Sequence, residues 1–310
     1  IALPGGKWII ASSMTGGPVE TGALYAIDSK TAKPTKLYPT SGAASREAKG
    51  CGKEVAANQF AGHGVSFVPN ATGGGVLYVV NHGGRESVEI FDLAPGKKTS
   101  APPKLTWTGC VVAPAGVMQN SVAALPSGAF FVTVTPNEAL GVLKTSPVYG
   151  DVRAFSPTGG WSAVPESEMP FPNGIVASPD GSKLYIGSWA GTKLIELTLG
   201  ERPVRRALKV NFMIDNLRWG ADRSLLAAGH DANAKQAITD CYYTKNASCP
   251  VEAFAARIDP AALNVVCEMR AGPTFRTVAI NVGDEVWMGS ARGPSILRLP
   301  SAALMNCAPL

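Results

Sequence analysis

The sequence lacks the short motifs that mark most familiar catalytic and metal-binding sites. It has no C-x-x-C pair, which disfavours a zinc ribbon. It has no G-x-S-x-G, H-E-x-x-H or Walker motif, and no G-x-G-x-x-G that would open a helix. A serine triad, a zinc protease and a nucleotide-binding enzyme are therefore disfavoured. Chemistry based on metal-activated water or on a metal-bound substrate remains open.

Long apolar runs and concentrated charge are also missing. No run reaches the roughly 18 apolar residues of a membrane helix, so we expect no membrane span. Charged residues make up 16% of the 310 residues, and the net charge is only +5. We interpret the densest basic group as a solvated strand edge, because no aromatic stripe accompanies it, and we expect no nucleic-acid partner. That group is Arg202, Arg205, Arg206 and Lys209.

Cysteine is scarce, but its count is even and its spacing wide. The six cysteines stand at positions 51, 110, 241, 249, 267 and 307. This pattern favours disulfides and hence the periplasm or a secreted protein, with buried thiols in a cytosolic protein as the alternative. No basic segment followed by an apolar core precedes the first strand-like residues, so we expect that any signal peptide has already been removed. Cys241–Cys249, which flanks a short polar loop, is the favoured pair; Cys51–Cys110 and Cys267–Cys307 are two of many further connectivities.

Six loosely similar units follow one another along the chain. Each begins with a polar residue and an apolar strand, then has a turn rich in Pro, Asp, Asn or Gly, and then further apolar strands. Five units start near residues 63, 120, 173, 216 and 277, and a first unit at 8–10 and 23–27 lacks its opening strand. The clearest turn is Ser178-Pro179-Asp180-Gly181, where Pro presets φ and Gly accepts a positive φ.

These units predict an all-β fold. Their spacing is that of propeller blades with loops of variable length. We therefore expect one domain, residues 1–310, forming a six-bladed β-propeller with four-stranded antiparallel blades around a central channel. A β-sandwich is the structural alternative, but it does not require six similar units.

Polar residues at equivalent strand starts indicate a binding site. The first strand of each propeller blade lines the axis, so residues at the starts of these strands converge at one end of the channel. This reasoning brings together His63, Asn120, Asn173 and the pair Asp215-Asn216. Amide and carboxylate oxygens are ligands that suit Ca²⁺. We predict a Ca²⁺ site there, although Asn also begins strands simply because it tolerates turn geometry.

The three histidines all lie near predicted strand ends. His63 opens a first strand, and His82 follows the second strand of the same unit, so the two imidazoles can approach each other. One of them can then remove a proton while the other orients it. His230 follows a second strand in the fifth unit, and like His82 it is equally well explained as a structural residue.

Six stretches of sequence together resemble a known family. They are 62–67, 77–82, 87–91, 120–123, 173–175 with 178–181, and 214–216. In this order they resemble the six-bladed calcium lactonases of the paraoxonase/arylesterase and gluconolactonase-like superfamily. The most specific part is His63-Gly64-Val65 followed by Val79-Val80-Asn81-His82.

The resemblance implies a catalytic Ca²⁺ and a division of roles. It implies that Asn120, Asn173, Asp215 and Asn216 hold the metal, which polarises a lactone or ester carbonyl. It also implies that His63, assisted by His82, activates water, and that His230 lies near the pocket. Two family features are not found: a carboxylate ligand ahead of the first blade, and an Asp for a second, structural calcium where this chain has Ser121.

The sequence thus predicts a Ca²⁺-dependent hydrolase of lactones or aryl esters, a monomer acting on a small molecule. Two alternatives stay open: a related propeller with metal-independent condensing or lyase chemistry, as in strictosidine synthases, and a non-enzymatic binding propeller. Four aromatic residues are candidates for an apolar pocket wall, although core packing explains each of them equally well: Phe60, Phe171, Trp189 and Phe275. Selectivity is expected from the loops around 41–62, 137–150 and 231–250.

Overall fold

The fold is a six-bladed, all-β propeller, as the repeat pattern predicts. A computed structural model of the chain describes residues 1–15, 21–39, 47–48, 50–98, 100–137, 148–243, 249–291 and 295–305. The chain comprises two compact units, unit 1 (Ile1–Val132 and Phe155–Trp161) and unit 2 (Thr133–Ala154 and Ser162–Leu310). The boundary passes through the third blade, and each unit is described by itself below.

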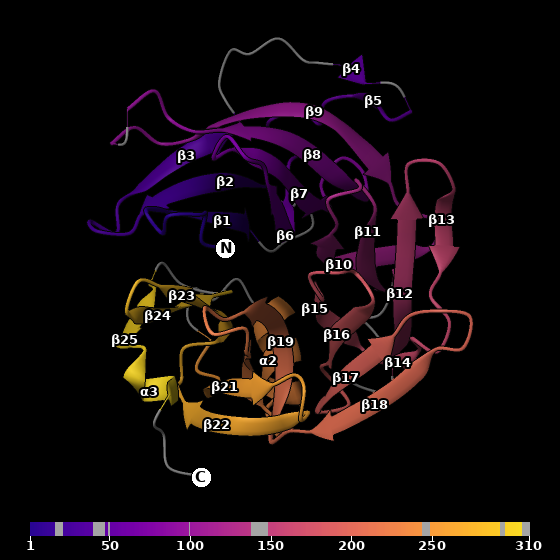
Figure 1. The fold of residues 1–310 in the computed structure, drawn as a ribbon, viewed down its shortest axis with the longest axis vertical. Helices are drawn as coiled ribbons and strands as arrows, with labels where there is room; N and C mark the ends of the chain where they lie inside the picture. The colour runs from indigo at the N-terminus through magenta and orange to yellow at the C-terminus, as the bar shows by residue number, and fades with distance from the viewer. Residues whose placement is uncertain are drawn as a thin grey trace. The chain divides into compact units, whose positions relative to one another are not determined.

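Unit 1 contains the first two blades and part of the third. Blade 1 is the sheet β1–β2–β3, blade 2 is β6–β7–β8–β9, and blade 3 has the order β10–β11–β12–β13 (Figure 1). A small hairpin, β4–β5, lies between blades 1 and 2 in the sequence. The strands of these blades and of the hairpin are β1 (Trp8–Thr15), β2 (Thr21–Asp28), β3 (Pro34–Tyr38), β4 (Glu47–Ala48), β5 (Gly52–Lys53), β6 (Gly62–Pro69), β7 (Gly75–Asn81), β8 (Ser87–Ala94), β9 (Lys104–Val112), β10 (Val117–Ala124), β11 (Phe130–Pro136), β12 (Tyr149–Ser156) and β13 (Gly160–Ala163). The boundary between the two units falls within β11, β12 and β13.

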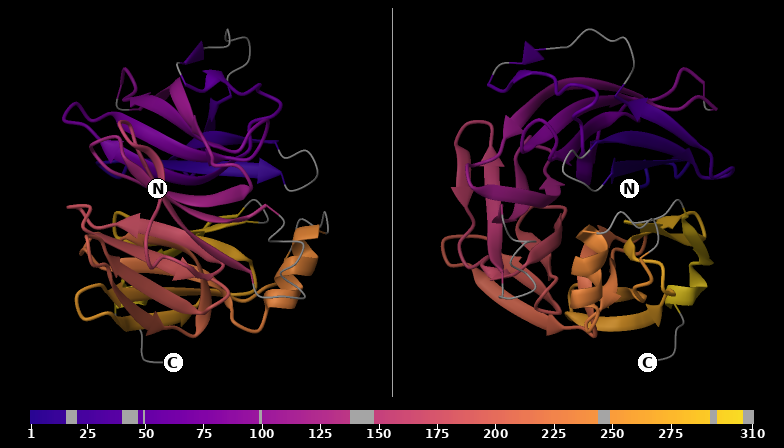
Figure 2. Two further views of the ribbon diagram at one scale, coloured as in Figure 1. Left: turned by 90° about the vertical axis from the view of Figure 1, so that its right-hand side faces the viewer. Right: turned by 180° about the vertical axis from the view of Figure 1, so that it is seen from behind.

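Unit 2 contains the remaining blades and the helices of the described chain. Blade 4 is β15–β16–β17–β18, blade 5 is β19–β20–β21–β22, and blade 6 is β23–β24–β25. The helix α2 lies at one end of these strands (Figure 2). The elements are β14 (Met169–Pro170), β15 (Pro172–Ala177), β16 (Lys183–Ser188), β17 (Lys193–Thr198), β18 (Val204–Lys209), β19 (Phe212–Trp219), β20 (Leu225–Asp231), α2 (Lys235–Tyr243), β21 (Ala253–Asp259), β22 (Asn264–Arg270), β23 (Arg276–Val282), β24 (Glu285–Ser290), β25 (Leu297–Pro300) and α3 (Ala302–Met305).

Several details differ from the sequence-based expectation. Blades 1 and 6 show three strands within the described residues, not four, and β14 adds a fifth strand to blade 3 by pairing with β12. Blade 1 does have its opening strand, because β1 pairs with β2 from Trp8 to Thr15. The loop expected at 231–250 contains the helix α2.

Local chemistry explains the turn between β15 and β16. Between β15 and β16, Ser178 N–H donates to the Lys183 carbonyl (2.8 Å) and Gly181 N–H donates to the Ser178 carbonyl (2.8 Å). Gly181 has a φ of 71°, which a residue with a side chain rarely adopts. The Asp180 carboxylate accepts from the Ser178 hydroxyl (2.5 Å) and from the hydroxyl and backbone N–H of Ser182 (2.8 and 3.1 Å), and these hydrogen bonds lower its pKa to about 2. The turn is therefore fixed by its own residues.

The first strands of successive blades lie next to each other within each unit. In unit 1, β6 contacts both β1 and β10, and in unit 2, β19 contacts both β15 and β23. Four of the first strands contain a register irregularity near their beginning, in β6, β15, β19 and β23. Such a bulge turns side chains out of the regular alternation and is common beside functional sites.

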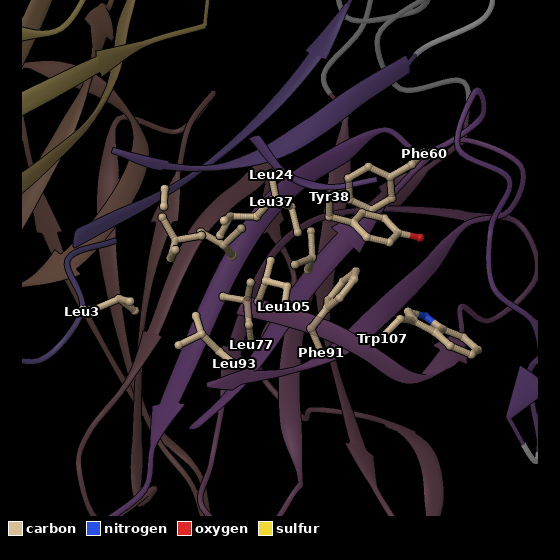
Figure 3. Close-up of a cluster of buried hydrophobic side chains, with 14 of the residues drawn as sticks. Leu3, Leu24, Leu37, Tyr38, Phe60, Leu77, Phe91, Leu93, Leu105 and Trp107 are labelled. Atoms are coloured by element: carbon tan, nitrogen blue, oxygen red, sulfur yellow. The ribbon is translucent and has the colours of Figure 1, made fainter. Parts of the chain in front are cut away.

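Each unit has its own apolar core. In unit 1, the Tyr38 ring packs edge-on against Phe60 (centroids 4.8 Å apart) and Phe91 (4.7 Å), beside Leu77 and Trp107 (Figure 3). In unit 2, the rings of Phe212 and Phe254 stack at 5.7 Å. All of these residues except Phe60 lie in strands, and a propeller buries both faces of its sheets by packing such side chains between neighbouring blades.

One disulfide joins a loop to strand β9 in unit 1, and another joins the helix α2 to the segment before β21 in unit 2. Cys51–Cys110 and Cys241–Cys249 are bonded, which confirms two of the expected pairs. Cys267 is also disulfide-bonded, and its predicted partner Cys307 lies outside the described residues. Disulfides are typical of proteins from oxidising compartments. None of the helices in the described parts has the length and apolar character needed to cross a membrane.

Candidate functional site

A chain of three hydrogen-bonded side chains lies in unit 1. His63 Nδ1 is 3.0 Å from His82 Nε2, and His82 Nδ1 is 2.9 Å from the Glu86 carboxylate oxygen Oε2. The other Glu86 oxygen accepts from the backbone N–H of Gln119 at 2.6 Å. The structure therefore brings together the two histidines that the sequence places at strand ends, and it adds a carboxylate behind them.

The bulge in β6 places His63. Gly62 pairs with Asn81 and Val65 with Val79, so His63 and Gly64 together oppose a single residue of β7. Gly64 lies so close to β10 that a Cβ there would be 2.5 Å from the Asn120 carbonyl oxygen. From the other side, the Ser12 hydroxyl of β1 donates to the His63 carbonyl at 2.5 Å. Blades 1 and 3 therefore both fix the backbone of this bulge.

The turn after β7 places His82 and Glu86. Asn81 is fully buried; its amide Nδ2 donates to the carbonyls of Gly83 and Arg85, each at 2.8 Å. Its Oδ1 accepts from Ala61 N–H at 2.9 Å. One buried amide thus connects this turn to the segment that leads into β6. These bonds hold in place the backbone that carries His82 and Glu86. Asn81 is structural, although it belongs to the resembling stretch 77–82.

The hydrogen bonds determine the tautomers that we assign. Glu86 accepts on both oxygens, so His82 donates from Nδ1 and presents its Nε2 lone pair to His63. His63 then donates from Nδ1, which leaves its Nε2 as the unprotonated nitrogen. Burial lowers the pKa of His63 to about 3, and the neighbouring His82 contributes to this. His63 is therefore neutral near pH 7, as a general base must be before it acts.

Glu86 is a residue that the sequence analysis missed. It stands four residues after His82, immediately before β8, and its side chain is 25% exposed. The signal that points to it is an acidic residue in the short turn that follows a strand-end histidine. A carboxylate in that position fixes the orientation and tautomer of an imidazole.

A second cluster, in unit 2, consists of oxygen-bearing side chains on β15 and β19. Asn173 is 5% exposed, and its Oδ1 is buried without a hydrogen-bond partner. Asp215 forms the bulge between Ile214 and Asn216 in β19. The Asn216 amide donates to Asp215 Oδ1 (2.8 Å) and to the Thr277 carbonyl (3.1 Å), which leaves its own oxygen as an acceptor.

Close backbone approach brings β15 and β19 together at this cluster. A Cβ on Gly174 would lie 2.6 Å from the Asn216 Cα, so only glycine fits there. The Thr133 hydroxyl donates to the Asn173 carbonyl at 2.6 Å and holds β15 from its other side. Asn120 and Asn216 lie within their strands, since β10 begins at Val117 and β19 at Phe212, so the expectation that they open these strands is wrong.

His230 belongs to the unit 2 cluster. It is 1% exposed, and its Nδ1 accepts a hydrogen bond from the Trp189 indole at 3.3 Å. The proton is therefore on Nε2, which lies 3.8 Å from Asp215 Oδ2, too far for a hydrogen bond. Burial lowers the pKa of His230 to about 3, so this ring is neutral.

The predicted aromatic wall is partly present. Phe171, Trp189 and Phe275 belong to one apolar cluster, which also includes Ile238 of α2. The centroids of the Phe275 and His230 rings are 4.4 Å apart. Phe171 and Phe275 both have a positive φ, 45° and 47°, a strained conformation that tends to occur at functional sites. Phe60 is part of the unit 1 core instead (Figure 3).

The unit 2 oxygens fit a hard cation. Burial raises the pKa of Asp215 to about 7, and the guanidinium of Arg218 only partly opposes this. The partnerless Asn173 oxygen and the desolvated carboxylate are both groups that a cation would satisfy. Within the described residues, no group of three or more His, Cys, Asp or Glu could hold a metal ion, so such a site must use amide oxygens.

Comparisons with known proteins show the fold. No protein-family model and no curated protein sequence matches the chain. A gluconolactonase from Xanthomonas campestris has 14% identity and a TM-score of 0.52, with 94% of this chain and 86% of that one covered. A luciferin-regenerating enzyme has 15% identity and a TM-score of 0.51, with 92% and 85% covered. A chain from a nidogen–laminin complex has 12% identity and a TM-score of 0.55, with 94% and 89% covered.

Proposed function

We propose that the protein is a Ca²⁺-dependent hydrolase of lactones or aryl esters. The observation that carries the proposal is the hydrogen-bonded series His63–His82–Glu86 at a bulge of β6. It presents one unprotonated imidazole nitrogen and backs it with a second imidazole and a carboxylate. This is the arrangement that general-base catalysis of water attack requires.

The three side chains divide the work of moving a proton. His63 Nε2 accepts a proton from the attacking water, and the Nδ1 proton of His63 can then move to His82 Nε2. The resulting positive charge rests beside the Glu86 carboxylate, 2.9 Å from His82 Nδ1. The carboxylate therefore makes an otherwise weakly basic, buried imidazole able to hold a proton.

Asn173, Asp215 and Asn216 are the proposed Ca²⁺ ligands in unit 2. Asn120, on β10 of unit 1, stays a ligand predicted from the sequence. A bound Ca²⁺ would polarise the carbonyl of the substrate and stabilise the negative charge that develops on its oxygen. His230 and Trp189 form part of the apolar wall beside Asp215. An acyl or aryl group of the substrate can pack against this wall.

The protein's surroundings follow from the same observations. The disulfides support a periplasmic or secreted location. The substrate is a small molecule, and we propose that the protein acts as a monomer. The gluconolactonase and the luciferin-regenerating enzyme show that this fold accommodates enzymes, and the nidogen–laminin complex shows that it also occurs in a protein assembly.

A lactone and aryl-ester panel, assayed with and without metal, tests the proposal. We expect hydrolysis that EDTA abolishes and Ca²⁺ restores, and a loss of about 10- to 100-fold in Ca²⁺ affinity for Asn173→Ala. Asn264→Ala, at an exposed strand end, is the matched control and should behave as the wild type. Full activity of metal-free protein, or of Asn173→Ala, would contradict the Ca²⁺ mechanism. Absence of hydrolysis across the panel would favour lyase, condensing or binding functions.

A further inference from the structure

Arg276 is a buried cation at the start of blade 6. It is the first residue of β23 and is 5% exposed. Its Nη1 donates to the carbonyls of Met288 (3.0 Å) and Ser295 (3.4 Å), whereas its Nε is buried without a hydrogen-bond partner. Backbone carbonyls thus hold one end of the guanidinium, and its buried Nε–H has no hydrogen-bond partner.

Among the described residues, no acidic side chain forms an ion pair with Arg276. Burial lowers its pKa, and no carboxylate opposes that effect. By contrast, Arg257 pairs with Asp222 at 3.0 Å and Arg298 pairs with Glu285 at 2.7 Å. A buried charge is stable only when it is paired and hydrogen-bonded. Arg276 therefore requires a negative group that the described chain does not supply.

The neighbours of Arg276 place it beside the candidate site. Phe275, just before it, contacts the His230 ring, and Thr277, just after it, accepts the hydrogen bond from Asn216. Thr274 contributes a second buried polar atom, Oγ1, without a hydrogen-bond partner. Two unsatisfied donors, one of them charged, thus lie within three residues of each other on the segment that adjoins the unit 2 cluster.

We propose that Arg276 and Thr274 bind the carboxylate group of a small-molecule ligand. A carboxylate carries the single negative charge that Arg276 lacks, and its planar pair of oxygens matches one edge of a guanidinium. The Thr274 hydroxyl can donate to the same group. Resting on the proposed function, this inference narrows the substrate class to lactones or esters that also bear a carboxylate.

Isothermal titration calorimetry with sodium butyrate tests the site without any assay of hydrolysis. The sodium concentration is held constant with sodium chloride, and butyramide is the neutral comparison. We expect wild-type protein to bind butyrate in preference to butyramide, and Arg276→Met to bind butyrate roughly tenfold more weakly or worse. Arg298→Met, which removes a paired arginine of the same blade, should leave butyrate binding unchanged.

Two further measurements complete the test. Arg276→Lys keeps the charge but loses the planar pair of N–H donors of the guanidinium. Its affinity for butyrate should therefore fall between those of wild type and Arg276→Met. Where hydrolysis is found, kcat/KM of Arg276→Met should fall for a carboxylate-bearing ester but not for its neutral analogue. Equal binding of butyrate and butyramide by wild type, or wild-type butyrate affinity in a folded Arg276→Met, overturns the inference. Butyrate binding without hydrolysis would retain this site and reject the hydrolase.

Discussion

At the scale of single residues, both clusters depend on side chains displaced from the regular strand alternation. His63 and Gly64 share one position of β6, Asn173 and Gly174 share one position of β15, and Asp215 is the extra residue in β19. In each case a polar side chain is presented where an unbroken strand would place an apolar one. Because of the bulges, the same first strands can contribute apolar side chains to the core and polar side chains to the candidate sites.

Glu86→Gln tests the carboxylate behind the histidines. The neutral amide keeps the size of the side chain but cannot stabilise a positive charge on His82. We expect kcat to fall about 10- to 100-fold with KM little changed. The acid limb of the pH–rate profile should move to lower pH, because the imidazole pair then holds its proton less firmly. Steady-state kinetics over the pH range measure both effects.

Glu201→Gln, in an exposed turn, is the matched control for that experiment and should leave the profile unchanged. A purely structural role of Glu86 would lower activity and stability together without moving the acid limb. An unchanged kcat in Glu86→Gln would remove the carboxylate from the mechanism.

At the scale of elements, the distance between neighbouring first strands sets the geometry of the unit 2 cluster. Gly174→Ala would place a methyl group 2.6 Å from the Asn216 Cα. Because backbone must move to accept it, we expect a loss of about 1–3 kcal/mol in the free energy of unfolding, together with weaker Ca²⁺ binding as Asn173 and Asn216 separate. Urea unfolding and Ca²⁺ titration calorimetry measure the two effects.

Gly109→Ala is the control for that comparison. Gly109 lies within β9, and a Cβ there meets only the Ala48 side chain, at 3.5 Å. The free energy of unfolding of Gly109→Ala should differ from that of the wild type by less than about 1 kcal/mol. If Gly174→Ala were tolerated as well as Gly109→Ala, the approach of β15 to β19 would not position the cluster.

Elements also show where sequence reasoning succeeds and where it stops. The turn at Ser178–Gly181 and the strands beside it follow from local propensity, so they were predictable. The helix α2 was not, because it has no acidic residue in its first turn and no basic residue in its last. Glu86 was missed because its role depends on how a turn folds back onto His82. Arg276 was missed because the sequence shows only a basic residue at the start of a strand and does not reveal that it is buried.

At the scale of the whole molecule, the disulfides stabilise the two units to different extents. Cys51–Cys110 closes a segment of 59 residues in unit 1, and Cys241–Cys249 closes one of 8 residues in unit 2. A longer loop loses more conformational freedom in the unfolded chain when it is closed. The first disulfide also anchors the segment whose carbonyls, at Cys51 and Lys53, accept hydrogen bonds from Arg85.

Replacing each pair with serine tests this order of stabilisation. From loop length alone, the variant lacking Cys51 and Cys110 should lose about 4 kcal/mol, and the variant lacking Cys241 and Cys249 about 2.5 kcal/mol. Because Arg85 directly precedes Glu86 in the chain and also binds Glu89, the first variant should lose activity at denaturant concentrations where the second remains active. Guanidinium unfolding, followed by tryptophan fluorescence and by activity, measures both. A greater loss of unfolding free energy on removing Cys241–Cys249 would contradict the loop-length argument. It would mean that the disulfide of α2 stabilises the fold more than Cys51–Cys110 does.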